Sequence, residues 1–357
     1  MADSRQPGIP LIVERLVFGG AGIGRLGNGK ICFVRQVIPG ERVKVRSRTE
    51  RASYVEAELE EIIEASPDRV APGCLVYGQC GGCHYQHISY PLQLVIKGDQ
   101  VREVLRRMGG VSDPPVEPVL PSPLQYGYRN RITVHSKSGR TGFFGARSRR
   151  IVDVPRCPIA SDRVNALLAQ LRKSHPSDGE HFLAEPAEFR GFRQVNDAAA
   201  AHLLDRVREM ASPGGRLLVD AYCGAGFFAK HLADRFESTI GIEWSPDAVR
   251  SARRKAGSSE VYLLGDVKDH LVSALEAAPP ADTTLLLDPP QEGVDEEVLA
   301  IVMARQPSRL IYVSCNPPTL ARDIKRMNGG FGIRRVCPVD MFPQTAEIEV
   351  AALLEKI

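Results

Sequence analysis

Four apolar, β-favouring runs alternate with helical patterns in the second half of the chain. They are Leu217–Val219, Ser238–Ile242, the start of Thr283–Pro290, and Leu310–Val313. Strands of a parallel sheet are buried on both faces, so they appear as continuous apolar runs. The residues at or just beyond the ends of these runs are Asp220, Glu243, Asp288 and Cys315. We therefore predict a Rossmann-like α/β domain with functional side chains at the carboxyl edge of its sheet, where open α/β sheets bind ligands.

The last run leads into the stretch 310–324, which reads LIYVSCNPPTLARDI. Proline fits the first turn of a helix because its missing N–H is not needed there, so the pattern predicts a strand, a short turn and a helix. Cys315 is expected at this junction, where a helix N-terminus favours the thiolate over the thiol. A buried structural cysteine is the alternative, but the polar SCNP turn does not resemble a core segment.

The stretch 216–230 reads RLLVDAYCGAGFFAK and contains two candidate ligand-binding glycines, Gly224 and Gly226. Glycines in such a loop let the backbone approach a ligand closely. Glu243, at the end of the next strand, is placed to accept hydrogen bonds from ribose hydroxyls. The third glycine of the dinucleotide pattern is missing, since Phe228 and Ala229 follow Gly226. S-adenosylmethionine contains adenosine but no phosphate, so it fits this loop better than NAD.

Residues 9–62 are predicted to form a small β-domain of short strands separated by glycine turns. The strands expected are Val13–Phe18, Lys30–Val37, Glu41–Arg48 and Ser53–Ile63. In the third strand Arg42, Lys44, Arg46 and Arg48 alternate with smaller residues, which places four positive charges on one face. That face suits a phosphate backbone, and a solvated strand face is an equally good interpretation.

Pro91–Met108 is predicted to be an amphipathic helix that ends at Gly109-Gly110. Leu94, Val101, Leu105 and Met108 share one face of it. After a proline-rich linker at 111–123, a β-rich piece is expected from Tyr126 to about Glu188. It carries the basic residues Arg129, Arg131, Lys137, Arg140, Arg147, Arg149 and Arg150, with Phe143 and Phe144 among them. Such a mixture suits single-stranded RNA. We interpret the charges as RNA contacts and the two rings as mostly core.

Four of the eight cysteines form a metal-binding pattern, namely Cys74, Cys80, Cys83 and Cys157. A C-x5-C-x2-C run with a distant fourth cysteine is typical of a metal or cluster site. Zinc sites usually show two paired arms, so a [4Fe–4S] cluster fits the single distant ligand better. Disulfides are a third reading, but they are rare in cytosolic proteins. Cys32 and Cys337 are expected in the core, and Cys223 in the cofactor loop.

Several motifs together are similar to those of the RNA uracil-5 methyltransferase family, which contains the 23S rRNA and tRNA 5-methyluridine enzymes. They are FRQVN at 192–196, DAYCGAGFF at 220–228, GIE at 241–243, LLLDPP at 285–290, YVSCNPPTLARD at 312–323 and VDMFPQTAEIE at 339–349. The N-terminal β-domain resembles the TRAM domain that family members often carry. The resemblance agrees with the [4Fe–4S] assignment and covers nearly the whole chain.

The resemblance implies three parts and a set of site residues. The parts are a TRAM-like barrel at 1–64, a central β-rich domain with the cluster at 65–190, and a class I S-adenosylmethionine methyltransferase domain at 191–357. The helix at 91–109 is expected to pack on the catalytic domain. The implied roles are nucleophile for Cys315, base for Glu349, and cofactor contacts for Gln194, Tyr222, Phe227, Glu243 and Asp288. From pattern alone, Glu349 reads equally well as an exposed strand residue.

Two positions depart from the family pattern. Gln291 stands where an arginine usually follows the DPP turn, and Ala346-Glu347 replaces a polar pair that usually includes histidine. Neither position is the expected nucleophile or base. The first change removes a positive charge near the site and so bears on RNA contact.

The expected partner is RNA, with 23S rRNA favoured and the T-loop of tRNA as the alternative. The net charge is only +3, so contacts with nucleic acid must come from local clusters. The start, MADSRQPGIP, is polar and no apolar run approaches the ~18 residues of a membrane span, so we expect a cytoplasmic protein without signal peptide. A monomer is the default expectation. Two other classes remain: an amino-group methyltransferase, which needs no cysteine nucleophile, and a non-catalytic RNA-folding factor, which would not need Cys315 and Glu349.

Overall fold

The computed structural model describes residues 8–186 and 194–357. The chain divides into two compact units. The first contains Met1–Gln100, Leu124–Glu185 and Phe342–Glu347. The second contains Val101–Pro123, Pro186–Met341 and Ile348–Ile357. None of the described helices is long and apolar enough to cross a membrane.

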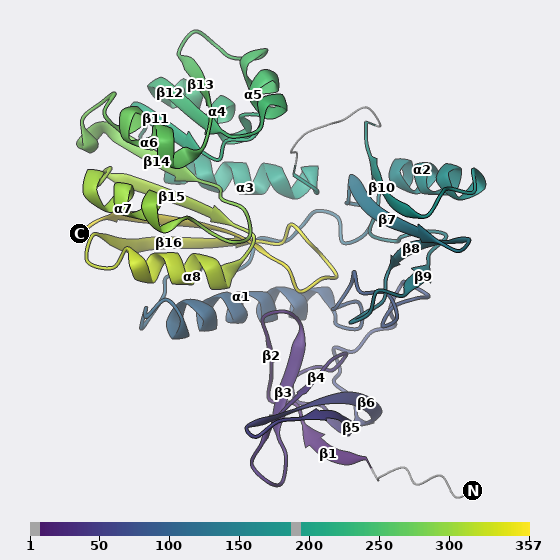
Figure 1. The fold of residues 1–357 in the computed structure, drawn as a ribbon. Coiled ribbons are helices and arrows are strands. Elements are labelled where there is room, and N and C mark those ends of the chain that lie inside the picture. Colours follow the sequence, from purple (N-terminus) through teal and green to yellow (C-terminus); the bar gives the residue numbers. More distant parts are fainter. Residues whose placement is uncertain (1–7, 187–193) are drawn as a thin grey trace, which may run out of the picture. The chain divides into compact units, whose positions relative to one another are not determined.

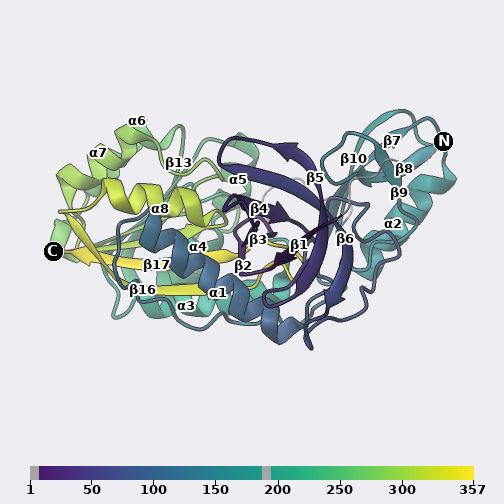
Figure 2. The same cartoon turned by 90° about the horizontal axis from the view of Figure 1, so that it is seen from below.

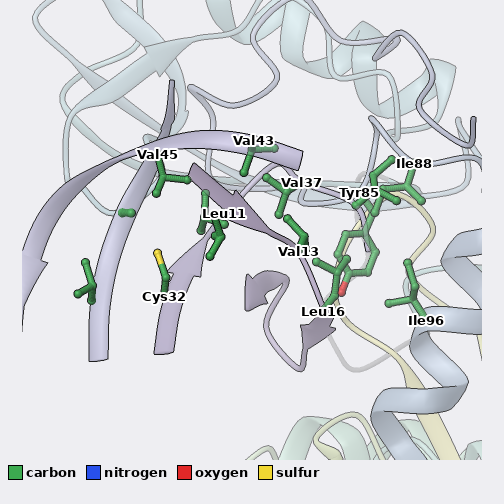
Figure 3. Close-up of a cluster of buried hydrophobic side chains, with 14 of the residues drawn as sticks. Leu11, Val13, Leu16, Cys32, Val37, Val43, Val45, Tyr85, Ile88 and Ile96 are labelled. Atoms are coloured by element: carbon green, nitrogen blue, oxygen red, sulfur yellow. The ribbon is translucent and has the colours of Figure 1, made fainter. Parts of the chain in front are cut away.

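The first unit begins with a six-stranded sheet in the order β1-β5-β6-β4-β3-β2. Its strands are β1 (Ile9–Ile12), β2 (Arg15–Val17), β3 (Ala21–Arg25), β4 (Ile31–Val34), β5 (Arg42–Glu50) and β6 (Tyr54–Glu64). All neighbours are antiparallel except β4 and β6, and the long strands β5 and β6 curve across the sheet (Figure 2). Alternate side chains of these strands enclose one core, in which Cys32 is buried as expected. Figure 3 shows Leu11, Val43 and Val45 in this core, with Tyr85 and Ile96 from the segment that follows.

The basic stripe of β5 alternates with buried valines as predicted, but most of its charges are paired. Arg42 lies 2.8 Å from Glu64, Lys44 lies 2.6 Å from Glu61, and Arg48 lies 3.4 Å from Glu58. All three glutamates come from the neighbouring strand β6. The face is therefore mixed in charge, which favours the interpretation of a solvated strand face.

Helix α1 (Tyr90–Arg107) forms where predicted, but its buried face differs from the prediction. Val101 and Leu105 are buried, whereas Met108 is exposed. Gln93 is also buried, and its Nε2 donates to the carbonyls of Tyr85 at 3.1 Å and Ile88 at 2.9 Å. The helix thus buries polar side chains by pairing them with backbone, which an apolar periodicity does not reveal.

A four-stranded sheet with the order β10-β7-β8-β9 completes the first unit (Figure 1). Its strands are β7 (Arg131–Lys137), β8 (Arg140–Phe144), β9 (Ile151–Asp153) and β10 (Gly179–Ala184). Helix α2 (Asp162–Lys173) interrupts this β-rich piece and was not predicted. Ser161 caps it by accepting from the backbone N–H of Val164. The expectation that both rings are mostly core is wrong for Phe144, which is 40% exposed.

The second unit is built on a seven-stranded sheet in the order β13-β12-β11-β14-β15-β17-β16, and helices flank the sheet (Figure 1). The strands are β11 (Gly215–Ala221), β12 (Phe236–Glu243), β13 (Glu260–Leu264), β14 (Thr283–Leu287), β15 (Arg309–Ser314), β16 (Phe331–Val339) and β17 (Glu349–Lys356). The first five in chain order are parallel, and β17 runs antiparallel to β15 and β16.

The helices of this unit alternate with the strands, and the first and the fourth of them were not predicted. They are α3 (Asp197–Met210), α4 (Phe227–Leu232), α5 (Pro246–Arg253), α6 (Val267–Leu275), α7 (Glu296–Arg305) and α8 (Pro317–Arg326), with short 3₁₀ turns at Ala233–Arg235 and Pro280–Asp282. Every residue of β14 is buried, as expected for a strand covered on both faces. The four predicted strand–loop–helix units are therefore confirmed.

Candidate active site

Cys315 lies between β15 and α8, at the strand-to-helix junction that the sequence predicts. It is half-buried. The preceding Ser314 closes the turn on both sides: its Oγ accepts from the N–H of Asn316 at 3.1 Å and donates to the carbonyl of Asn316 at 3.2 Å. Pro317 then opens α8 at its first turn. The junction holds the thiol beside the positive end of a helix dipole, which favours a thiolate.

Glu349 is the first residue of β17, the strand that pairs with β15. In the antiparallel pairing of β15 and β17, Ser314 lies opposite Val350. This is the last pair of the ladder, and Cys315 directly follows Ser314 while Glu349 directly precedes Val350. Directly opposed residues of antiparallel strands have Cα atoms about 4.5–5.5 Å apart. Glu349 is only 5% exposed, so the interpretation of an exposed strand residue is wrong.

The SCNP turn is tied to the DPP turn that follows β14. The Nδ2 of Asn316 donates to the backbone carbonyl of Gln291 at 2.9 Å, and the Oγ1 of Thr319 donates to the same carbonyl at 3.2 Å. These contacts use the main chain of Gln291, while the residue itself is exposed. The glutamine that departs from the family pattern therefore leaves the link between the two turns intact.

A buried carboxylate that the sequence analysis did not single out supports this turn. Asp323 is completely buried and accepts from the Tyr312 hydroxyl at 2.8 Å, the Val294 N–H at 2.9 Å and the Arg322 Nε at 2.8 Å. Gly293 has a φ of +84°, and a Cβ there would lie 2.5 Å from Asp323 Oδ2. The sequence contained two signals for this contact, a tyrosine (Tyr312) inside an apolar run and an acid (Asp323) on the following helix. A buried tyrosine hydroxyl needs a hydrogen-bond partner.

The glycine loop after β11 is held by the acid predicted to bind ribose. Glu243 Oε2 accepts from the N–H of Gly224 at 3.0 Å, and Oε1 accepts from the N–H of Ser245 at 2.8 Å. Gly224 and Gly226 have φ values of +55° and +79°, a region that glycine enters without strain. Tyr222 also has a positive φ of 65°. The loop is thus preorganised, and Glu243 retains lone pairs for a ligand.

Two further carboxylates lie at the same sheet edge. Asp220 is completely buried, and its Oδ2 accepts from the N–H of Ala229 at 2.9 Å, which fixes the start of α4. Its Oδ1 has no hydrogen-bond partner among the described residues. Burial raises the pKa of Asp220 well above its ordinary value and raises the pKa of Asp288 to about 7. The backbone N–H of Asp288 donates to the carbonyl of Ala221 at 3.3 Å, which links the turn after β14 to the end of β11.

The other expected cofactor residues lie at the entrances of helices. Phe227 is the first residue of α4 and packs edge-on against Phe228, with ring centroids 5.0 Å apart. Gln194 is 7% exposed and lies three residues before Asp197, the first residue of α3. Asn196 caps α3 and donates from Nδ2 to Ser122 Oγ at 3.0 Å and to the Met341 carbonyl at 3.2 Å. Residues 192 and 193 of the FRQVN motif lie outside the described part of the chain.

The four cysteines of the proposed cluster line a single cavity of about 310 Å³ in the first unit. Burial raises the pKa of the Cys83 thiol to about 12 and also raises that of Cys80 and Cys157. Cys157 is held through its backbone, with its N–H donating to Asn165 Oδ1 at 2.8 Å. Within the described residues, no three His, Cys, Asp or Glu side chains form a metal-binding group. The fold therefore brings the thiols to one cavity without closing them into a coordination sphere.

Comparison with known proteins gives consistent matches. The model of the family described as tRNA (Uracil-5-)-methyltransferase matches residues 280–357, and that of the TRAM domain matches residues 9–59. A protein of Synechocystis sp. described as an uncharacterized RNA methyltransferase is 31% identical over 98% of this chain and 96% of its own. A relative from Bdellovibrio bacteriovorus with the same description is 32% identical over 97% and 94%.

A solved structure shares the fold along almost the whole chain. It is the Pyrococcus abyssi tRNA (uracil-54, C5)-methyltransferase in complex with S-adenosyl-L-homocysteine, which is 22% identical to this chain with a TM-score of 0.71. The match covers 98% of this chain and 100% of the other. The expected fold class, a Rossmann-like methyltransferase domain with an N-terminal β-barrel, is thereby confirmed.

Proposed function

Because this chain belongs to the RNA uracil-5 methyltransferase family, we propose that it methylates C5 of a uracil in RNA by a covalent mechanism, with Cys315 as nucleophile and Glu349 as base. The family uses S-adenosylmethionine as methyl donor, which supplies an electrophilic methyl group when bound. The observation that carries the proposal is the β15–β17 pairing, whose last pair, Ser314 and Val350, directly adjoins Cys315 and Glu349.

The chemistry requires both side chains because C5 of uracil is a poor nucleophile. The Cys315 thiolate adds to C6 and forms an S–C6 bond, and the ring electrons move toward C5 as an enolate. C5 then forms a bond to the donor's methyl group while the bond between that methyl and the sulfonium sulfur breaks, so the donor would leave as the uncharged thioether. Glu349 takes the remaining proton from C5, the C5–C6 double bond returns, and the thiolate leaves as the S–C6 bond breaks.

The expected cofactor residues have the chemistry that S-adenosylmethionine requires. Glu243 suits the ribose hydroxyls because its oxygens are already aimed by two backbone N–H groups. Tyr222 and Phe227 offer half-buried aromatic rings beside the glycine loop, and Asp288 offers a carboxylate for the cationic half of the cofactor. Gln194 adds a buried amide at the entrance to α3.

Cys74, Cys80, Cys83 and Cys157 would hold a [4Fe–4S] cluster that has a structural task. Four thiols around one desolvated cavity suit a cluster, since metal ligation stabilises the thiolate form that burial otherwise disfavours. The cluster would tie the loop at 74–83 to Cys157 ahead of α2. Iron and acid-labile sulfide analysis of protein purified without oxygen tests this assignment, and stoichiometric zinc without sulfide would contradict it.

The favoured substrate is 23S rRNA, and tRNA is the second candidate because the matching family model is named for tRNA. The test is methyl transfer from labelled S-adenosylmethionine to unmodified 23S rRNA and to unmodified tRNA in separate reactions, followed by nucleoside analysis. 5-Methyluridine in one RNA supports the chemistry and identifies the target. If neither RNA gains 5-methyluridine although the protein has its metal, the proposed reaction is wrong.

A further inference from the structure

We propose that the first unit contains a subsite for one unstacked nucleotide of the RNA, with the base against Phe144 and His135 and the phosphate at Arg35 and Arg147. The proposal rests on the proposed function in that RNA is the substrate. It adds a binding site in the first unit, away from the residues assigned to methyl transfer.

The sheet that carries the two rings is covered on one face only. Alternate residues of β7 point to opposite faces, and Ile132 and Val134 are buried in a core with Val164 and Leu168 of α2. Thr133 therefore lies on the other face and is exposed. A sheet with one solvated face that carries aromatic rings is the arrangement on which RNA-binding sheets stack bases.

The uncovered face carries an aromatic pair. The rings of His135 and Phe144 are stacked with centroids 4.0 Å apart and planes 22° apart. Phe144 remains 40% exposed, and Phe182, which pairs with Thr133 across β10 and β7, is 48% exposed. Exposed phenylalanines on one sheet face are unfavourable in water, and base stacking gives them an apolar partner.

A pocket of about 430 Å³ opens beside this pair. Its lining includes Thr133, His135, Phe144, Tyr77, Arg35 and Arg147. The volume lies within the range of small-molecule sites, about 300–1,000 Å³. The pocket, which Cys80 and Cys83 of the proposed cluster also line, combines aromatic rings with guanidinium groups at a size that suits one nucleotide.

The two arginines have more positive charge than their neighbours neutralise. Arg35 donates from Nη1 to the carbonyl of Gly19 at 3.0 Å, and its buried Nε has no hydrogen-bond partner among the described residues. Burial and the nearby charge of Arg147 both lower the pKa of Arg35. Arg147 pairs with the carboxylate of Glu56 at a long 3.7 Å. Two guanidinium groups beside each other favour an anion between them, and an RNA phosphate is such an anion.

The cysteine loop holds the aromatic strand end in place. The N–H of Gly81 donates to the Phe144 carbonyl at 3.0 Å, and the N–H of Ala146 donates to the Gln79 carbonyl at 2.9 Å. The backbones of Cys80 and Gly145 also form an isolated antiparallel β-bridge. Phe144 is thus fixed by backbone contacts, and a preorganised ring loses little entropy when a base stacks on it.

The test measures the affinity of the full-length protein for a labelled single-stranded oligouridylate of about 12 nucleotides, a length within the range that such sites occupy. Phe144→Ala should weaken binding about 10-fold, whereas Phe144→Tyr should bind nearly as the unchanged protein. Arg35→Gln and Arg147→Gln should each weaken binding several-fold. Each should also reduce the slope of the logarithm of the binding constant against the logarithm of the salt concentration by about 1, the value for one phosphate contact.

Two matched variants control for general effects. Arg163→Gln removes an exposed guanidinium from α2, on the covered side of the same sheet, and Ile63→Ala removes an exposed apolar side chain from β6. Both should bind as the unchanged protein does. Phe144→Tyr keeps the test informative if Phe144→Ala does not fold, because a loss of affinity in a folded Phe144→Tyr contradicts a stacking role.

The outcomes separate this proposal from the proposed function. If the unchanged protein methylates RNA and folded Phe144→Ala binds oligouridylate with unchanged affinity, the subsite is wrong and the methyltransferase assignment stands. If Phe144→Ala weakens binding but the unchanged protein forms no 5-methyluridine, the subsite stands and the proposed reaction is wrong. An equal affinity for an RNA duplex of the same length would also overturn the subsite, since a paired base cannot stack on Phe144.

Discussion

Two groups of cysteines in this protein lie in opposite chemical environments. Cys315 is half-buried beside a helix N-terminus, in a turn closed by Ser314 and Asn316. Cys83 and its three partners line one cavity, and burial raises the thiol pKa of Cys80, Cys83 and Cys157. A thiol that must attack needs a polar, accessible setting, whereas a thiol that binds metal can be desolvated because the metal supplies the compensating charge. The two proposed tasks, nucleophile and cluster ligand, thus fit the two different surroundings.

The largest effect should come from the reactive pair. Cys315→Ala should lower methyl transfer at least about a thousandfold, because no other group can form the bond to C6. Glu349→Gln should still form that bond but fail to release the product, so a protein–RNA adduct accumulates. Denaturing gel electrophoresis of reactions with labelled RNA measures the adduct. Normal turnover by Cys315→Ala would contradict the covalent mechanism. An adduct in the variant that combines Cys315→Ala with Glu349→Gln would show that another residue forms the bond to C6.

Loss of one cluster cysteine should affect stability and metal content together. Cys83→Ser should release iron and lower the melting temperature by roughly 5–10 °C. A ligand whose concentration is about a thousand times its dissociation constant adds about 4 kcal/mol to the free energy of unfolding. The matched control is Cys337→Ser, because Cys337 is buried in the second unit and its Sγ lies 2.9 Å from Glu117 Oε2. Iron content should be unchanged in the control. Equal iron in both variants would show that Cys83 is not a ligand.

The Asp323 network should have a smaller effect, on the geometry of the nucleophile. Asp323→Asn keeps the size of the side chain but weakens three hydrogen bonds to a buried carboxylate, at a cost of about 2–3 kcal/mol. Tyr312→Phe removes one of them and should cost about 1 kcal/mol. Urea denaturation measures both variants. Turnover should fall in Asp323→Asn with the KM for RNA little changed; an unchanged turnover would mean that the network is only structural.

The catalytic junction could be predicted from sequence because local signals agree there. The apolar run, the polar turn and the prolines are consecutive, so one stretch specifies the strand, the turn and the helix that position Cys315. Glu349 is different, because the β15–β17 register decides which residue of β17 lies beside the end of β15, and register depends on long-range pairing. The quoted motif identified Glu349 by resemblance, while its burial became visible only in the fold.

Long-range contacts also explain the wrong predictions. The basic alternation in β5 was visible, but its neutralisation depends on which glutamates of β6 lie beside it. Helix α1 was found by its apolar residues, whereas Gln93 is buried because backbone carbonyls of the first unit accept its hydrogen bonds. Phe144 was expected in the core because phenylalanines usually are. Its exposure follows from α2 covering only the other face of the sheet.

The smallest predicted effect is a pH dependence at the cofactor edge, which a buried carboxyl of raised pKa should produce. The pKa of Asp288 is raised to about 7 in the folded protein, above an ordinary value of 3.8. Between these values the folded state binds more protons than the unfolded state, so the stability that this group contributes is present below about pH 4 and is lost as the pH rises through about 7. A cationic cofactor prefers the carboxylate, so its affinity should rise over the same interval, by about tenfold or less.

Intrinsic fluorescence can measure both curves, since the single tryptophan, Trp244, directly follows Glu243 and is 73% exposed. Titration with S-adenosylhomocysteine, which lacks the sulfonium charge, should show a weaker pH dependence than titration with S-adenosylmethionine. Asp288→Asn should remove the pH dependence of both affinity and stability in this interval. If the dependence persists in Asp288→Asn, another group at the edge titrates, and Asp220, whose pKa burial also raises, is the residue to change next.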